Sequence, residues 1–144
     1  MTIVLIAFDG SENAMRAIDE VLNTMDTGKL HVHLLYVCEP VQMNEVVFNE
    51  NPLLDMLSIK KAREEAGMVL LTPAKMRLES AGITFEAHVR NGNPAEVITG
   101  FSGENRCDLI VMGTRGMGTI KNLLLGSVAS KVIHLTEKPL LLVK

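Results

Sequence analysis

Five short apolar runs recur along the chain, separated by longer segments in which apolar and polar residues mix. They cover residues 3–8, 31–38, 83–90, 108–112 and 140–143. The first, fourth and fifth runs are nearly continuous, which is typical of strands covered on both faces, whereas the third alternates apolar and polar positions. The pattern therefore predicts five β-strands.

The segments between these strands are predicted to be helical. Ser11 is a favourable N-cap for a first helix whose apolar residues recur at helical spacing up to residue 25. A long, charge-rich helix over 53–80 contains Pro73, so we expect a kink or a break there. Its charged run over 60–65 is predicted to be a solvated helix face. Pro94 suits the first position of a short helix, and a last helix precedes the fifth strand.

Strands and helices thus alternate in the order βαβαβαβαβ. Such alternation implies a parallel sheet with helices on both faces, and right-handed crossovers make it a doubly wound α/β fold. We expect a single domain over residues 1–144. Ligands in this fold bind outside the carboxyl ends of the strands, where the sequence has a turn at residues 9–11 and a loop that starts at Gly113.

Composition and charge narrow the range of partners. Of the 144 residues, 47% are apolar and 22% are charged, and the net charge of −3 gives no broad attraction to nucleic acid or to an anionic membrane. The first apolar run lacks the basic residues of a secretion signal and is cut short by Asp9. Cys38 and Cys107 are too few for a disulfide scaffold, so we expect a cytoplasmic protein.

A glycine-rich loop follows the fourth strand. It contains Gly113 and Gly116, and Gly126 with Ser127 stands at the start of the last helix. Glycine lets backbone N–H groups approach a ligand closely, and a helix N-terminus carries a partial positive charge that attracts phosphate. A single glycine is typical of a tight turn or a helix cap, but several at a strand exit indicate a phosphate-binding site.

Two common nucleotide motifs do not fit this loop. The dinucleotide fingerprint G-x-G-x-x-G fails because Lys121 stands where the third glycine belongs. The Walker A ending G-K-[ST] does not occur in the sequence. A basic side chain, Arg115 or Lys121, would still add positive charge beside a bound phosphate.

The spacing of these glycines resembles the nucleotide-binding signature of the universal stress protein family: Gly113-x-x-Gly116, nine residues, then Gly126-Ser127. The resemblance extends over the whole chain, with further similar blocks at 4–11, 91–96 and 108–113. It implies a sheet with the strand order 3-2-1-4-5. Because the glycines are present, it also implies the ATP-binding branch of the family.

The resemblance further implies which residues contact ATP. They lie at the ends of the first, second and fourth strands, in the glycine-rich loop and at the start of the last helix: Ala7, Phe8, Asp9, Val37, Met112, Gly113, Arg115, Gly116, Gly126, Ser127 and Val128. Asp9 would lie beside the ribose or the Mg²⁺ or Mn²⁺ ion on the phosphates, and Val37 would meet adenine through its backbone. Ala129 departs from the family, where a hydroxyl residue is common, so one phosphate contact would be missing.

The last strand, Leu140–Val143, would lie at an edge of the sheet in that strand order. An apolar edge strand invites pairing with another chain, and the resemblance implies a symmetric homodimer through this strand. A monomer whose edge is protected by Lys138, Pro139 and Lys144 stays open as the alternative.

The four histidines give no metal site in the sequence alone. His31 and His33 share one strand face, but we find no further ligands at a supporting spacing, and His88 and His134 stand isolated. We therefore predict histidines that pack or lie at the surface, and no metal site made by the protein alone.

These observations favour an ATP-binding stress-response protein that regulates through a nucleotide-dependent conformational equilibrium. We expect ATP hydrolysis to be slow at most, because the sequence contains no evident dedicated general base. Two alternatives stay open. One is a phosphotransfer or hydrolytic enzyme that uses Asp9, and the other is an interaction module that needs no nucleotide.

Overall fold

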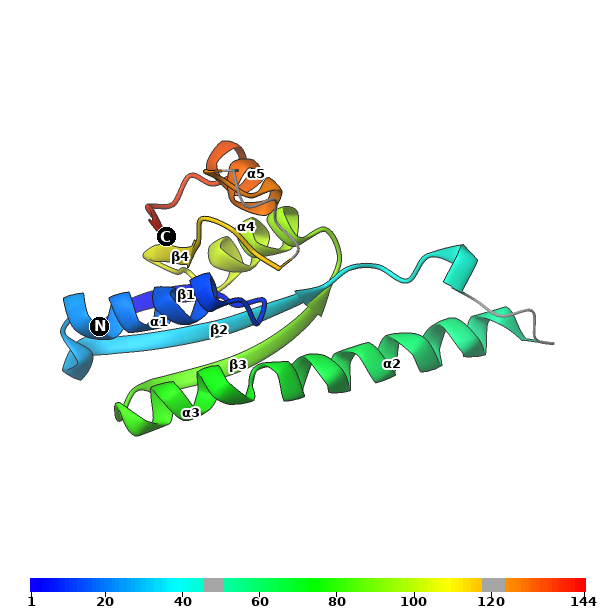
Figure 1. Ribbon diagram of the computed structural model, residues 1–144, viewed down its shortest axis with the longest axis horizontal. Helices are drawn as coiled ribbons and strands as arrows, with labels where there is room; N and C mark the ends of the chain where they lie inside the picture. The colour runs from blue at the N-terminus through cyan, green and yellow to red at the C-terminus, as the bar shows by residue number, and fades with distance from the viewer. Residues whose placement is uncertain (46–50, 118–123) are drawn as a thin grey trace.

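The computed structural model describes residues 1–45, 51–117 and 124–144, and Figure 1 shows the arrangement of its helices and strands. Five parallel strands form one sheet in the order β3-β2-β1-β4-β5. Their bounds are β1 Thr2–Ala7, β2 Leu30–Cys38, β3 Thr84–Asn91, β4 Leu109–Gly113 and β5 Leu140–Val143. The predicted doubly wound α/β fold and its strand order are therefore confirmed.

Helices cover both faces of this sheet (Figure 1). Their bounds are α1 Glu12–Thr24, α2 Pro52–Leu70, α3 Thr72–Ser80, α4 Pro94–Glu104 and α5 Ser127–Leu135, with 3₁₀ turns at Thr27–Lys29 and Met43–Glu45. α1 and α3 pack on one face against Val4 and Ile6, and α4 and α5 pack on the other against Leu5. All three of these β1 side chains are fully buried, which explains the continuous apolar run.

Local signals in the sequence set the ends of the helices. Ser11 caps α1 as predicted, since its hydroxyl accepts a hydrogen bond of 3.1 Å from the N–H of Ala14. The long predicted helix is broken at the fully buried Leu71, and Pro73 lies in the first turn of α3, where its missing N–H removes no helical hydrogen bond. None of the helices in the described ranges is long and apolar enough to cross a membrane.

The strand register leaves a crevice at the carboxyl ends of the central strands. Ala7, the last residue of β1, is paired with Leu35 on one side and with Met112 on the other. β2 continues beyond Leu35 to Cys38, so its last residues extend past the end of β1. From β1 the chain crosses to β2 on one side and later to β4 on the other. This is the switch point at which doubly wound folds bind ligands.

Candidate functional site

A cavity of about 650 Å³ lies at the carboxyl ends of β1, β2 and β4. Its walls come from the turn after β1, the end of β2, one side of α2, the start of α4, the loop after β4 and the first turn of α5. All eleven residues selected from the sequence line it: Ala7, Phe8, Asp9, Val37, Met112, Gly113, Arg115, Gly116, Gly126, Ser127 and Val128. Residues that are far apart in the sequence therefore meet around one cavity.

The Asp9 carboxylate ties the turn after β1 to the glycine-rich loop. Its Oδ1 accepts a hydrogen bond of 2.9 Å from the N–H of Ser11, and its Oδ2 accepts one of 3.0 Å from the N–H of Met117. Gly10, which lies between Asp9 and Ser11, has a φ of +86°, a conformation that favours glycine. Both oxygens of Asp9 thus have backbone partners, so the side chain positions the loop.

Two glycines of the loop are required by close approaches. A Cβ added to Gly116 would overlap with Oδ2 of Asp9. One added to Gly113 would lie 2.7 Å from Cβ of Asn13 on α1. A side chain at position 113 would clash with the α1 helix itself, whereas one at position 116 would displace the Asp9 carboxylate, so glycine at both positions allows the loop to pack against α1 and the β1 turn.

The N-terminus of α5 also lines the cavity. Gly126 is its N-cap and donates a hydrogen bond of 2.6 Å to the carbonyl of Thr114. Among the described residues no side chain caps the helix, and Ser127, Val128 and Ala129 all line the cavity. The first N–H groups of a helix have no partner within it and attract anions. This wall is suited to an anionic ligand.

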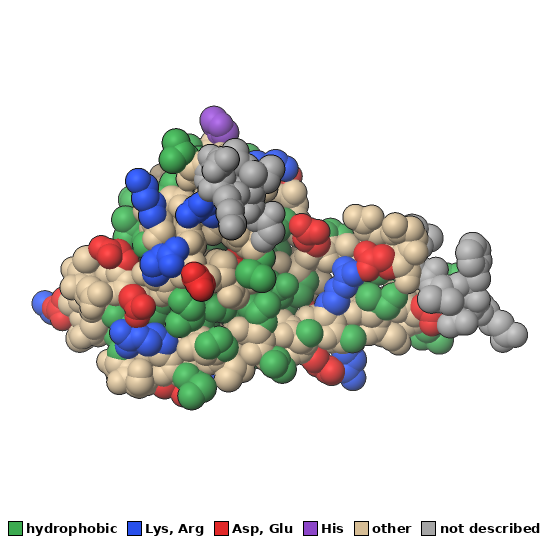
Figure 2. All heavy atoms as spheres, in the orientation of Figure 1, with side chains coloured by type: hydrophobic (Ala, Val, Ile, Leu, Met, Phe, Trp, Pro, Cys, Tyr) green, Lys and Arg blue, Asp and Glu red, His purple; other side chains and the backbone are tan. Residues whose placement is uncertain are grey.

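Of the two basic residues expected beside the bound phosphate, Arg115 and Lys121, the structure describes Arg115. Arg115 lines the cavity and is half-buried. Lys121 lies outside the described residues. On the face of the molecule in Figure 2, acidic and basic side chains are interspersed. The groups lining the cavity that can attract an anion are the loop, the start of α5 and Arg115.

Thr114 is a structural residue of the site that the sequence analysis missed. Its N–H donates a hydrogen bond of 2.8 Å to the carbonyl of Val143 at the end of β5. Its hydroxyl accepts one of 3.4 Å from the amide of Asn13, a buried polar residue on α1. Together with the bond from Gly126, these contacts join β5, α1 and α5 at the start of the loop.

The wall formed by α2 was also missed. Arg63 lies in a charged segment that reads in sequence as a solvated helix face, yet it lines the cavity. Its guanidinium donates a hydrogen bond of 3.2 Å to the carbonyl of Glu39 and pairs with the carboxylate of Glu45. Gly67 lets α2 lie close to Tyr36, because an added Cβ would be 2.8 Å from that ring. Burial raises the pKa of Tyr36, so its hydroxyl stays protonated at neutral pH.

The part of the cavity beside the strands is apolar. Ala7, Leu35, Ile98 and Met112 line it, and all four belong to or pack against the core between the sheet and α4. Val37 lines it too, beyond the point where β1 ends. The cavity therefore combines an apolar region beside a strand with a polar region formed by the loop and the helix N-terminus.

The structure corrects the sequence analysis of the histidines. His88 is not isolated, because its Nε2 lies 3.1 Å from Nδ1 of His33. Glu86 is close as well, with its carboxylate 3.3 Å from Nε2 of His31. Sequence spacing hid these contacts because β2 and β3 are joined by two helices and meet only in the sheet.

Known proteins resemble this chain over its full length. The family model of the universal stress protein family matches residues 1–144. Universal stress protein YxiE of Bacillus subtilis is 28% identical over 146 residues, which cover 98% of this chain and 97% of the relative. The "Universal stress protein in QAH/OAS sulfhydrylase 3′region" of Thermus aquaticus is 32% identical over 143 residues, which cover 98% and 97%.

Solved structures share the fold. The structure of the hypothetical protein MJ0577 has a TM-score of 0.83 at 29% identity and covers 99% of this chain and 95% of that one. A universal stress protein in complex with cAMP has a TM-score of 0.70 at 22% identity, with coverage of 99% and 95%. A universal stress protein family protein of Arabidopsis thaliana with AMP bound has a TM-score of 0.71 at 22% identity, with coverage of 100% and 92%.

Proposed function

Because the chain belongs to the universal stress protein family, we propose that it binds an adenine nucleotide, ATP with Mg²⁺ or Mn²⁺, in the cavity at the carboxyl ends of β1, β2 and β4. One observation carries the proposal: the glycine-rich loop and the start of α5, which no described side chain caps, border the same cavity as an apolar region beside β2. The two related structures that hold cAMP and AMP support it, since their shared fold accommodates an adenine nucleotide.

In this proposal the apolar region takes the base and the polar region takes the phosphates. Adenine lies between the apolar side chains and the backbone of Val37, and the ribose lies near Asp9. The phosphates lie beside Gly116 and accept hydrogen bonds from the backbone N–H groups of Ser127 and Val128 and from the Ser127 hydroxyl. The cavity volume of about 650 Å³ lies within the roughly 300–1,000 Å³ common for small-molecule sites.

The carboxylates around the cavity are suited to a phosphate-bound Mg²⁺, and Asp9 is the best placed of them. Mg²⁺ in nucleotide sites is usually held by one or two carboxylates together with phosphate oxygens and water. Glu45 is paired with Arg63, whereas Asp9 lies against the glycine-rich loop and each of its oxygens keeps further lone pairs. Asp9 would hold the ion, which would neutralise phosphate charge.

We propose regulation rather than efficient catalysis as the role of this site. Each Asp9 oxygen already accepts a backbone hydrogen bond, which favours a positioning role over that of a nucleophile or base. ATP would shift the protein toward the conformation that binds it better, and so act in a stress response. Steady ATP turnover that Asp9→Asn abolishes, with affinity intact, would instead make Asp9 catalytic.

We further propose a cytoplasmic homodimer that pairs β5 with its twin. β5 is an edge strand of the described sheet, and its residues Leu140–Val143 are apolar and half-buried. Pairing two such edges about a two-fold axis would cover both. The buried thiols Cys38 and Cys107 suit a reducing compartment. Light scattering that finds a monomer at tens of micromolar, roughly the range of moderate self-association, would defeat the dimer.

Calorimetric titration of ATP and Mg²⁺ into the purified protein tests the nucleotide site. We expect one ATP per chain in the wild type and loss of binding in the double variant Gly116→Arg, Ser127→Ala, which fills the phosphate region and removes a hydroxyl. Gly100→Ala on α4 is the matched control, because its added Cβ meets no described atom within 4 Å. No binding by the wild type, or equal binding by the wild type and the double variant, would contradict the proposal.

A further inference from the structure

Three of the four histidines of the chain meet one carboxylate on a single face of the sheet. His31 and His33 belong to β2, and Glu86 and His88 belong to β3. In the register of these strands His33 is paired with Glu86. His31 is two residues from His33 on β2, and His88 is two residues from Glu86 on β3, so all four residues lie on the same face. All four side chains therefore project toward the layer of α4, where Phe101 contacts the rings of His33 and His88.

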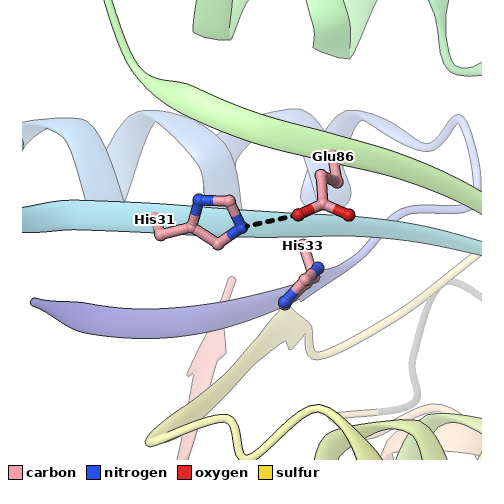
Figure 3. Close-up of side chains that lie close together, drawn as sticks. All are labelled: His31, His33 and Glu86. Carbon is pink, nitrogen blue, oxygen red and sulfur yellow. Dashed lines mark ion pairs between the residues drawn. The ribbon is translucent and has the colours of Figure 1, made fainter.

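The side chains of this cluster lie close enough together to converge on one metal ion. Figure 3 shows His31 and Glu86 joined by an ion pair, with His33 beside them. One nitrogen or oxygen from each of these three residues lies within 4.8 Å of the other two, and the pair in Figure 3 is 3.3 Å apart. Two ligand atoms of a tetrahedral zinc ion, at bonds of about 2.0–2.2 Å, are themselves separated by roughly 3.3–3.5 Å. Small side-chain rotations would therefore bring the three groups around one ion.

We propose that His31, His33 and Glu86 form a binding site for a divalent transition-metal ion, for which Zn²⁺ is the best match. Imidazole and carboxylate are the ligands that zinc takes in sites with three protein ligands and an open fourth position. The fourth position would hold water or a small ligand. Glu86, whose side chain is 60% exposed on the edge strand β3, gives the ion access from solvent.

His88 is a positioning residue in this site. Its Nε2 lies 3.1 Å from Nδ1 of His33, so a hydrogen bond between them would fix the ring of His33 and leave its other nitrogen for the metal. It also lies 4.0 Å from the second oxygen of Glu86. Burial, followed by the neighbouring imidazole, lowers the pKa of both His33 and His88, so these rings are neutral at pH 7. Neutral imidazole is the form that binds metal.

The metal site is separate from the proposed nucleotide site. His33 precedes Val37 by four positions on β2, a distance of about 13 Å along the strand. The site lies toward the amino ends of the strands, whereas the cavity lies at their carboxyl ends. The inference does not depend on nucleotide binding, and its test uses nucleotide-free protein.

Calorimetric titration of ZnCl₂ into the full chain, first treated with chelator, tests the site. We expect one Zn²⁺ per chain in the wild type and at least tenfold weaker binding in Glu86→Gln and in His31→Gln. His88→Gln should weaken binding by about 10- to 100-fold, as expected for a partner that orients a ligand. His134→Gln, at the exposed histidine of α5, is the matched control and should bind like the wild type.

A thermal melt with and without Zn²⁺ gives a second measurement that separates binding from folding. Zn²⁺ should raise the Tm of the wild type and of His134→Gln by the same amount, and that of Glu86→Gln, which alters only an exposed side chain, by clearly less. Absence of binding at roughly 100 µM Zn²⁺, enough to fill a micromolar site, would overturn the proposal. Equal binding by the wild type and Glu86→Gln would also overturn it, because the ion would then lie elsewhere, for example at a cysteine.

Discussion

Gly116→Ala is the smallest change that tests how the glycine-rich loop is held. The added Cβ would overlap with Oδ2 of Asp9, so the carboxylate has to move. That oxygen accepts the 3.0 Å hydrogen bond from the N–H of Met117, and the bond would be lost or lengthened. The other oxygen can keep its bond to Ser11, so the turn after β1 should survive.

The size of the effect follows from this one hydrogen bond. Hydrogen bonds to charged groups contribute about 1.5–3 kcal/mol, and the lower value applies because the Met117 end is exposed. We expect phosphate to bind only when the loop is held in this conformation. Without the hydrogen bond, part of the binding free energy of ATP is used to hold the loop, and the affinity falls by that amount. A cost of about 1.5 kcal/mol weakens the affinity for ATP about tenfold.

Calorimetry with ATP and Mg²⁺ measures this change, and a double-mutant cycle assigns its cause. Asp9→Asn replaces the acceptor, so Gly116→Ala should cost much less in the Asp9→Asn background than in the wild type. Gly100→Ala, a glycine-to-alanine change away from the cavity whose added Cβ meets no described atom within 4 Å, should keep wild-type affinity while stabilising the fold by about 0.5–1 kcal/mol. An affinity of Gly116→Ala within twofold of the wild type would refute the reasoning, as would full additivity in the cycle.

Three further predictions concern the stability of the fold, and urea denaturation measures all of them. Gly67→Ala should lower the free energy of unfolding by about 1 kcal/mol, because crowding against Tyr36 outweighs the better helix propensity of alanine; an unchanged or raised value would contradict this. Ser11→Ala should lower it by about 1 kcal/mol through loss of the α1 cap, and no loss would mean that the cap is dispensable. With chelator present, the free energy of unfolding should decrease as the pH falls through and below 6.5. Burial lowers the pKa of His33 and His88 in the folded protein, so in this range the unfolded chain binds protons that the folded protein does not. A free energy of unfolding that does not change over this pH range would disprove the prediction.

The parts of the fold that sequence could predict are those with a local cause. The apolar run of β1, the Ser11 cap and the break before Pro73 each depend on neighbours within a few residues, and the structure has all three. The glycines at 113 and 116 could be recognised by their spacing. The sequence does not reveal why glycine is needed at these positions, because the cause is close contact with Asn13 and Asp9, about a hundred positions earlier in the chain.

What sequence could not predict depends on register and on packing between distant segments. Arg63 looks like one charge of a solvated helix until α2 is placed beside Glu39 at the end of β2. His33 and His88 are 55 positions apart and meet only because β2 and β3 pair in one particular register. A shift of that register by one residue would send Glu86 and His88 to the opposite face and dissolve the cluster.

The nucleotide that stays with the purified protein is the most direct test of the central claim. Denaturing the purified wild type and analysing the released small molecules by mass spectrometry should give ATP, in an amount that Gly116→Arg, Ser127→Ala strongly reduces. Release of no adenine nucleotide, together with no binding of added ATP and Mg²⁺ at about 1 mM, would contradict the account.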